Sequence, residues 1–172
     1  ELVFPFPVLN ASGLPVILSK PRKLYSVHDL VAATEDGTYP FAHFFNGALI
    51  DMSAVRAVGN VDSRFFMFGD EVDYFFRLRK VGKVYSVIKA RHMHPDVSDR
   101  PYTPAKVYYY VKNTLVLNNR YFDWPWVRHG LALVAVLMRT AQRNGWGEAL
   151  SYVAGKRAPA LYSAIGRGLA GQ

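Results

Sequence analysis

The chain changes character near residue 103, and this change limits the folds open to it. Before that point, short apolar runs are interrupted by Pro and Gly, a pattern that predicts strands, turns and short helices. Thr103 and Pro104 then open a helical pattern that reaches about Tyr121, with Thr as the N-cap and Pro at the first helical position. A second helix is expected after Asp123 and Pro125, followed by one or two shorter helices. The sequence therefore predicts a mixed α/β part followed by a part made of helices alone.

Several shorter elements are expected in the first part. The apolar runs Gly47–Ile50, Phe65–Phe68 and Val84–Ile88 are typical of short buried strands. A helix is expected to begin at Asp70, a good N-cap residue, and to end near Val81, just before a glycine.

Composition excludes several classes of protein. A length of 172 residues suffices for one domain with a sizeable core, or for a large part of one. The absence of Cys excludes a disulfide scaffold and a Cys-ligated zinc or iron site, so a cytoplasmic location is expected. The longest apolar stretch, Gly130–Met138, is shorter than the roughly 20 residues that a membrane span needs. The chain begins with Glu1 and has no signal-peptide pattern, so we expect it to continue a longer protein.

Positive charge dominates the second half of the chain. The formal net charge is +8, and after residue 122 six Lys or Arg residues face only Asp123 and Glu148. Such an excess predicts an anionic partner, namely phosphate, an anionic membrane or nucleic acid, although a solvated basic surface is the plain alternative. The sequence contains no RNP or KH motif, so a nucleic-acid partner is not expected.

Tryptophans accompany these cations in the tail. Trp124, Trp126 and Trp146 lie among the basic residues, a combination typical of helices that lie on a membrane surface. We therefore expect peripheral binding to anionic lipid at the inner face of the cell membrane. The alternative is that the tail helices pack on the α/β part or on another copy in a homo-oligomer.

The most informative segment is Phe65–Lys80, where three carboxylates occur within four residues at the start of a predicted helix: Asp70, Glu71 and Asp73. Helix capping stabilises such charges by ~0.3–1 kcal/mol each and is a sufficient structural explanation. The functional alternative is a general base, which a helix N-terminus would keep ionised at neutral pH. Gly69 would let a ligand approach the backbone closely.

This segment and its surroundings resemble the inverting family-two glycosyltransferases of the GT-A fold, especially the bacterial rhamnosyltransferases and galactofuranosyltransferases. The resemblance rests on Phe45–Ile50, Gly59, Phe65–Tyr74, Arg77–Leu78 and Gly82, and covers roughly residues 40 to 122. Tyr108–Asn113 is similar to the family's Tyr-Tyr-x-x-Arg-Asn helix, with Lys112 in place of Arg. The resemblance to this family implies that residues 1–102 form the acceptor-side part of a Rossmann-like α/β catalytic domain. It also implies that residues 103–172 form a C-terminal helical extension.

The resemblance also implies roles for individual residues. The second residue of the family's acidic pair is the catalytic base, which makes Glu71 the candidate. The family's usual order is Glu-Asp, and the reversed order here leaves Asp70 as the alternative. The implied acceptor-binding residues are Asn46, Gly47, Gly69, Asp73 and Arg77.

Two histidines are candidate metal ligands. His92 and His94 are spaced i, i+2 after a predicted strand, so both would face the same side, although a chance pair on a surface edge explains the spacing equally. In metal-dependent members of the family, a histidine at this point completes an Asp-X-Asp site that holds Mn²⁺ or Mg²⁺ against the donor's diphosphate. This chain has no Asp-X-Asp, so we expect the donor-binding half on a missing segment, with a degenerate, inactive paralogue as the alternative.

The resemblance thus implies an enzyme that moves a sugar, with inversion, from a nucleotide-sugar donor to a glycan or polyprenyl-linked acceptor in bacterial cell-surface polysaccharide synthesis. The alternative is a non-enzymatic basic module that binds a membrane or another protein. The carboxylates at the predicted helix start favour the enzyme, because a module that only binds anions has no need to gather acids there.

Overall fold

The computed structural model describes residues 38–39, 48–84, 86–87 and 101–172. The chain divides into two compact units, and neither is continuous in sequence. One unit consists of residues 1–58 and 77–97, and the other of residues 59–76 and 98–172. We refer to them as the small-element unit and the helical unit, and describe each by itself.

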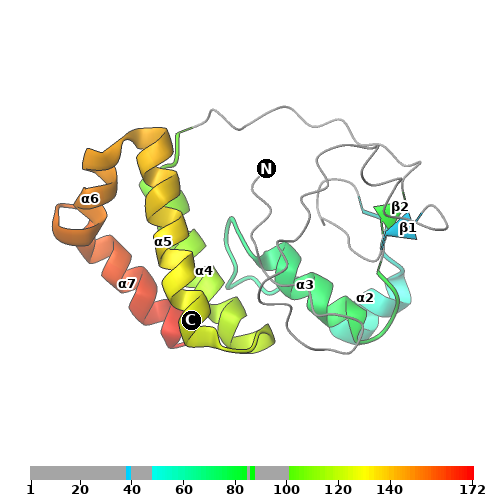
Figure 1. The fold of residues 1–172 in the computed structure, drawn as a ribbon. Helices are drawn as coiled ribbons and strands as arrows, with labels where there is room; N and C mark the ends of the chain where they lie inside the picture. Colours follow the sequence, from blue (N-terminus) through cyan, green and yellow to red (C-terminus); the bar gives the residue numbers. More distant parts are fainter. Residues whose placement is uncertain (1–37, 40–47, 85, 88–100) are drawn as a thin grey trace. The chain divides into compact units, whose positions relative to one another are not determined.

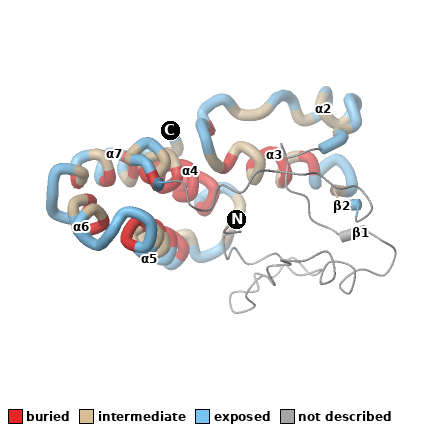
Figure 2. Tube along the Cα trace, turned by 90° about the horizontal axis from the view of Figure 1, so that it is seen from above, coloured by how far each residue is buried: buried red, intermediate tan, exposed pale blue. Residues whose placement is uncertain are grey.

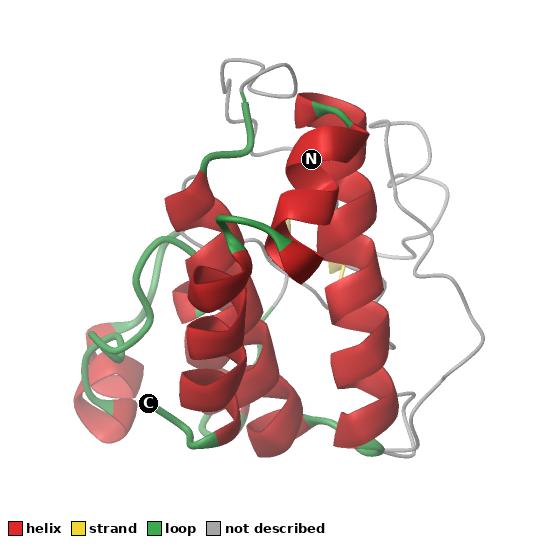
Figure 3. Ribbon diagram, turned by 90° about the vertical axis from the view of Figure 1, so that its left-hand side faces the viewer, coloured by secondary structure: helices red, strands yellow, loops and turns green. Residues whose placement is uncertain are grey.

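The helical unit contains four consecutive helices after residue 103: α4 (Pro104–Tyr121), α5 (Pro125–Asn144), α6 (Trp146–Ala154) and α7 (Ala158–Leu169). Short connections join them, as Figures 1 and 3 show. α4 packs against both α5 and α7, and α6 packs against α5 and α7. The predicted succession of helices in the tail is confirmed.

α4 is the centre of this unit. The Thr103 side chain accepts a hydrogen bond from the Lys106 backbone N–H, and Pro104 occupies the first turn, so the predicted helix start is confirmed. Every residue from Tyr110 to Asn118 is buried, whereas an amphipathic surface helix would bury only one stripe. Figure 2 shows this burial along α4. α4 is therefore covered on all sides in this stretch.

The residues that flank α5 on both sides have positive φ angles. Trp124 has a φ of 57° directly before Pro125, and Gly145 has a φ of 89° directly after the helix. The Asn144 side chain accepts from the Tyr102 N–H at 3.1 Å and donates to the Tyr102 carbonyl at 3.0 Å, so it ties the end of α5 to the residue before the α4 N-cap.

The acidic segment also belongs largely to the helical unit. α3 (Asp70–Arg79) contributes Asp70 to Phe76 to it, and its last three residues belong to the small-element unit. The helix starts one residue earlier than predicted, at the expected N-cap itself, because the Gly69 carbonyl already accepts from the Asp73 N–H at 2.9 Å. Asp70 is therefore the first helical residue.

The described part of the small-element unit is sparse. α2 (Met52–Val58) has no buried residue, and the Asp51 carboxylate caps it by accepting from the Ser53 N–H at 2.6 Å. Strands β1 (Thr38–Tyr39) and β2 (Ser86–Val87) pair antiparallel over two residues each.

The predicted α/β, Rossmann-like fold is wrong for the described residues. These residues form six helices, and the β1–β2 pair is the only sheet among them. Phe65–Phe68, predicted as a strand, forms a bend in which Met67 has a φ of 70°, outside the β region. Ala48–Ile50, most of another predicted strand, has no regular structure. Short apolar runs do not by themselves identify a buried strand. Here Phe65 alone of its run is buried, against Val116 and Leu117 of α4, whereas Phe66, Met67 and Leu49 are exposed.

Among the described helices, none combines the length and the apolar character that crossing a bilayer requires.

Candidate functional site

The loop before α3 contains two residues with positive φ angles, separated by Phe68. Met67 has a φ of 70° and Gly69 a φ of 86°, and the chain enters α3 directly afterwards. Positive φ is easy for glycine and uncommon for a residue such as Met, so neighbouring contacts must hold this bend in place. We call residues Asp62–Gly69 the presenting loop, because it precedes Asp70 and Glu71.

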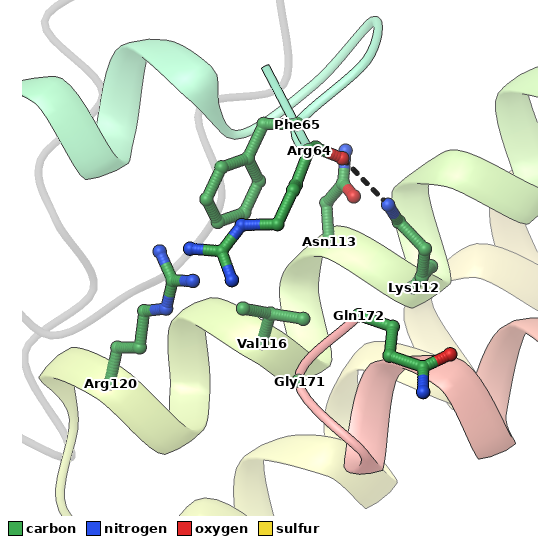
Figure 4. A pocket seen from close by; sticks show the side chains of 8 residues that line it. All are labelled: Arg64, Phe65, Lys112, Asn113, Val116, Arg120, Gly171 and Gln172. Atoms are coloured by element: carbon green, nitrogen blue, oxygen red, sulfur yellow. Dashed lines mark hydrogen bonds between the residues drawn. The ribbon is translucent and has the colours of Figure 1, made fainter. Parts of the chain in front are cut away.

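α4 holds the presenting loop through two consecutive side chains. Lys112 Nζ donates to the Arg64 carbonyl at 2.8 Å, the bond drawn in Figure 4. Asn113 Nδ2 donates to the carbonyls of Phe66 at 3.1 Å and Phe68 at 2.5 Å. Three alternate carbonyls are thus bound by helix side chains, where a β-strand would have bound a neighbouring strand.

Gly69 brings the loop into close contact with α4. A Cβ atom at this position would lie 2.9 Å from Leu117 Cδ1 and 3.4 Å from Asn113 Cβ. The space next to this glycine is therefore filled by the protein itself, and the expected contact between Gly69 and an acceptor stays a prediction.

Glu71 lies in an environment that favours its protonated form. Burial raises the pKa of its carboxyl group to about 7, and the side chain of Asp70 acts in the same direction. The Gly69 N–H donates to Glu71 Oε2 at 3.1 Å and opposes this rise. A pKa near 7 leaves this carboxyl group only partly ionised at neutral pH, less than a helix start alone would predict, because burial outweighs the backbone hydrogen bonds.

Asp73 is fully buried and already bonded. It accepts from Arg120 Nη1 at 2.9 Å and from the Tyr121 hydroxyl at 2.6 Å. Arg120 also reaches Asp62 at 3.2 Å, so it connects the presenting loop to α3. These bonds give Asp73 a structural role, and its predicted contact with an acceptor is not tested.

Arg77 also has a backbone partner. Its Nη1 donates to the Val58 carbonyl, the last residue of α2, at 2.8 Å. The bond satisfies one of the carbonyls that the end of a short helix leaves free. Its predicted role in acceptor binding remains a prediction.

A small pocket opens beside the presenting loop. It is a shallow depression without enclosed space for a water molecule, and Figure 4 shows its lining: Arg64, Phe65, Lys112, Asn113, Val116, Arg120, Gly171 and Gln172. Its cations already have partners, since Arg64 and Arg120 bond Asp62 and Lys112 bonds a carbonyl. Neither residue of the acidic pair lines it.

The remaining predicted site residues lie outside the described residues. These are the acceptor-site candidates Asn46 and Gly47 and the metal-ligand candidates His92 and His94. Within the ranges that the structure describes, no three His, Asp or Glu side chains are grouped closely enough to hold a metal ion. His129, which is described, is buried between Asn118 and Asn119, each 3.2 Å from one of its ring nitrogens.

Sequence reasoning missed the residues that build this region around Glu71. The sequence shows Lys112 and Asn113 only as part of a motif, and nothing in it marks Arg120 as a partner of Asp73. A signal was available: polar residues within the long apolar pattern of a central helix need buried partners, and free carbonyls of an irregular loop supply them.

Comparison with known proteins identifies no relative. No protein family, no curated protein and no solved structure matches this sequence.

Proposed function

We propose that this chain carries the general base of an inverting glycosyltransferase, which moves a sugar from a nucleotide-sugar donor to a glycan or polyprenyl-linked acceptor. The observation that supports the proposal is the environment of Glu71. A general base works best when its pKa lies near the working pH, and the pKa of Glu71 is raised to about 7. The α/β fold that the resemblance implies is not found in the described residues, so the proposal rests on the acidic motif and on the environment of Glu71.

The chemistry assigned to Glu71 is a single proton transfer. The acceptor sugar's hydroxyl oxygen attacks the anomeric carbon of the donor, the bond from that carbon to the diphosphate oxygen breaks, and Glu71 takes the hydroxyl proton. A base for this step must come within about 2.6–3.2 Å of the hydroxyl. The Gly69 N–H donates to one carboxyl oxygen, Oε2, and so helps to fix the orientation of the group.

The test is transfer by the full-length protein, with dTDP-rhamnose or UDP-galactofuranose as donor and a polyprenyl diphosphate-linked glycan as acceptor. Glu71→Gln should lower the rate by ~10²–10⁴-fold with the fold retained. Glu148→Gln is the matched control, because Glu148 bonds Arg157 in the tail and should leave the rate unchanged. Near-normal turnover in Glu71→Gln, with loss only in Asp70→Asn, would assign the role to Asp70.

The proposal retains Mn²⁺ or Mg²⁺ as cofactor, with His92 or His94 as ligand. The described carboxylates do not form a ligand set by themselves, and the family resemblance assigns the ligand role to these histidines. Such an ion would supply positive charge to the departing diphosphate. Ala substitution of both histidines should weaken metal-dependent activity, and an unchanged metal titration in the double variant would contradict the assignment.

We also propose that the helical unit binds a membrane surface through one face of α5. Val127, Leu131, Val134 and Met138 follow i, i+4, i+7, i+11 spacing, and each is 44 to 64% exposed. Such spacing places them on one stripe of a helix. Figure 2 shows that α5 has an exposed side as well as a buried one. We call these four residues the apolar stripe.

The composition around the apolar stripe favours lipid as its partner. The only charged residue between Val127 and Met138 is Arg128, which is buried, lies over the Phe122 ring and donates to the Asp123 carbonyl at 2.6 Å. Exposed tryptophans lie near both ends of α5, at Trp126 and Trp146, as in helices at a bilayer interface. The excess of Lys and Arg in the tail complements anionic headgroups.

Liposome co-sedimentation tests this surface with point variants, since truncation would uncover the buried α4. Leu131→Glu with Val134→Glu should abolish binding to phosphatidylglycerol vesicles. Gln142→Glu, an exposed change on the same helix beyond the stripe, should leave most binding intact. Equal binding by the stripe variant would contradict the proposal. A change in oligomeric state without a change in lipid binding would identify a second copy of the chain as the partner.

A further inference from the structure

A single peptide group connects Asn113 to Glu71. The carbonyl between Phe68 and Gly69 accepts from Asn113 Nδ2 at 2.5 Å. The N–H of the same peptide group, on Gly69, donates to Glu71 Oε2 at 3.1 Å. Because a peptide group is planar, a side chain that fixes the direction of its carbonyl also fixes the direction of its N–H.

The local backbone depends on this contact. Met67, with its φ of 70°, stands between the two carbonyls that Asn113 binds, those of Phe66 and Phe68. A non-glycine residue holds such a conformation only when its surroundings impose it. Asn113 is 1% exposed, so its two hydrogen bonds form away from competing water.

We propose that Asn113 is a positioning residue, which orients the carboxyl group of Glu71 through the Phe68–Gly69 peptide group. The inference rests on the proposed role of Glu71 as the base. Asn113 acts on the reaction only through that peptide group, and the prediction is that its loss changes the behaviour of Glu71 more than it changes the fold.

The direction of the effect follows from the hydrogen bonds. Without the Asn113 amide, the peptide group can rotate and the Gly69 N–H leaves Glu71 Oε2. That N–H stabilises the ionised carboxylate and holds the pKa of Glu71 below the value that burial alone would produce. Removing Asn113 should therefore raise the pKa of Glu71 further.

Asn118 provides a matched control on the same helix. It is also fully buried, and its Nδ2 lies 3.2 Å from His129 Nδ1 on α5, away from the presenting loop. In the described part of the chain, the Oδ1 atoms of Asn113 and Asn118 both have no hydrogen-bond partner. Replacing either residue by Ala thus removes a similar buried amide, but only one of them bonds the peptide group next to Glu71.

The experiment is a carboxyl ¹³C NMR titration of Glu71 in the full chain, in the wild type and in Asn113→Ala and Asn118→Ala. Thermal unfolding of both variants should show a similar loss. Only Asn113→Ala should raise the Glu71 midpoint, by about 0.5–1 pH unit. Asn113→Ser, whose hydroxyl can serve one carbonyl, should give a smaller rise and replaces Asn113→Ala if that variant does not fold.

The pH–rate profile of sugar transfer should shift to higher pH by the same amount in Asn113→Ala. In Asn118→Ala the profile should not shift. An unchanged Glu71 midpoint in folded Asn113→Ala or Asn113→Ser, or equal shifts in the two Ala variants, would overturn the inference. A shifted midpoint in a protein that transfers no sugar would support the positioning by Asn113 and refute the proposed function.

Discussion

At the scale of single residues, the acids of the α3 start differ sharply in what surrounds them. Asp73 has two close donors, Arg120 and the Tyr121 hydroxyl, and is locked into the structure. Glu71 has backbone donors, among them the Gly69 N–H, and an acidic neighbour, and burial is the largest influence on its pKa. Asp73 and Glu71 look alike in the sequence, yet only Asp73 meets a cation in the folded chain, while burial raises the pKa of Glu71.

The raised pKa of Glu71 makes stability depend on pH. The folded state binds this proton more tightly than the unfolded state, so its contribution is fully present below about pH 4.5 and is lost as the pH rises through about 7. Glu71→Gln cannot ionise and should be more stable than the wild type at pH 8 by about 3 kcal/mol, with little difference at pH 4.5. Urea unfolding at the two pH values checks this, and equal differences at both would show that burial does not perturb Glu71.

For the Asp73–Arg120 ion pair, removing the carboxylate should destabilise the protein, in contrast to Glu71→Gln. Asp73→Ala would leave Arg120 without its closest partner and should cost about 3–5 kcal/mol of unfolding free energy. Tyr121→Phe removes one hydrogen bond to the same carboxylate and should cost about 1–1.5 kcal/mol. Chemical denaturation of both variants measures the difference. A loss of less than 1 kcal/mol in Asp73→Ala would show that Asp73 contributes little to stability. Its predicted contact with an acceptor would then be the better explanation of this carboxylate.

At the scale of elements, the packing of α7 on α4 depends on one small residue. A Cβ atom at Gly168 would lie 2.8 Å from the Lys112 carbonyl and 2.9 Å from Leu115 Cβ. Gly166, two residues earlier on α7, has nothing within 4 Å of its Cβ position. The two glycines thus differ in their surroundings: Gly168 lies against the backbone of α4, whereas Gly166 has free space beside it.

Alanine should therefore have opposite effects at these two glycines. Gly168→Ala forces α7 away from α4 and should destabilise the protein by about 1–3 kcal/mol. Gly166→Ala gains helix propensity and should stabilise it by about 0.5–1 kcal/mol. Thermal unfolding of the two variants is the measurement, and similar changes in both would mean that α7 does not approach α4 this closely.

The elements that the sequence predicted well are those with local signals. Thr103 and Pro104 mark the start of α4, and Pro125 marks the start of α5. The predicted strand at Phe65–Phe68 failed because its backbone is held by Asn113, 47 and 45 positions away, which binds the carbonyls of Phe66 and Phe68. An apolar run in the sequence does not reveal such distant partners.

For the candidate site, the sequence located the acidic pair and its position at a helix start. It did not predict the ionisation of Glu71, because burial is a property of the assembled structure. The metal-ligand candidates His92 and His94 lie outside the described residues, so their assignment remains a prediction from the sequence.

At the scale of the whole molecule, the chain passes between its two units at residues 58, 76 and 97. The helical unit therefore needs residues 59–76, which supply Phe65 to its core against Val116 and Leu117. A fragment of residues 98–172 contains all four tail helices and lacks this insertion.

We expect the 98–172 fragment to be less stable than a 59–172 fragment, because the loss of Phe65 alone removes about 1.5–3 kcal/mol of apolar burial. The loss of Asp73 also leaves Arg120 without its buried partner. Circular dichroism during thermal unfolding compares the two fragments. Equal midpoints would show that α4 to α7 form an independent folding unit.

The burial of α4 on every side has a consequence for how the molecule opens. Its amides from Tyr110 to Asn118 are bonded within the helix and shielded by neighbouring elements, so their hydrogens can exchange with deuterium only when the helical unit unfolds. α2, which has no buried residue, can open by itself and exchange quickly. Mass-spectrometric hydrogen exchange should therefore find its slowest peptides in α4. The rate in those peptides would report the global unfolding free energy, and Asn118→Ala should accelerate it in proportion to the stability that it removes.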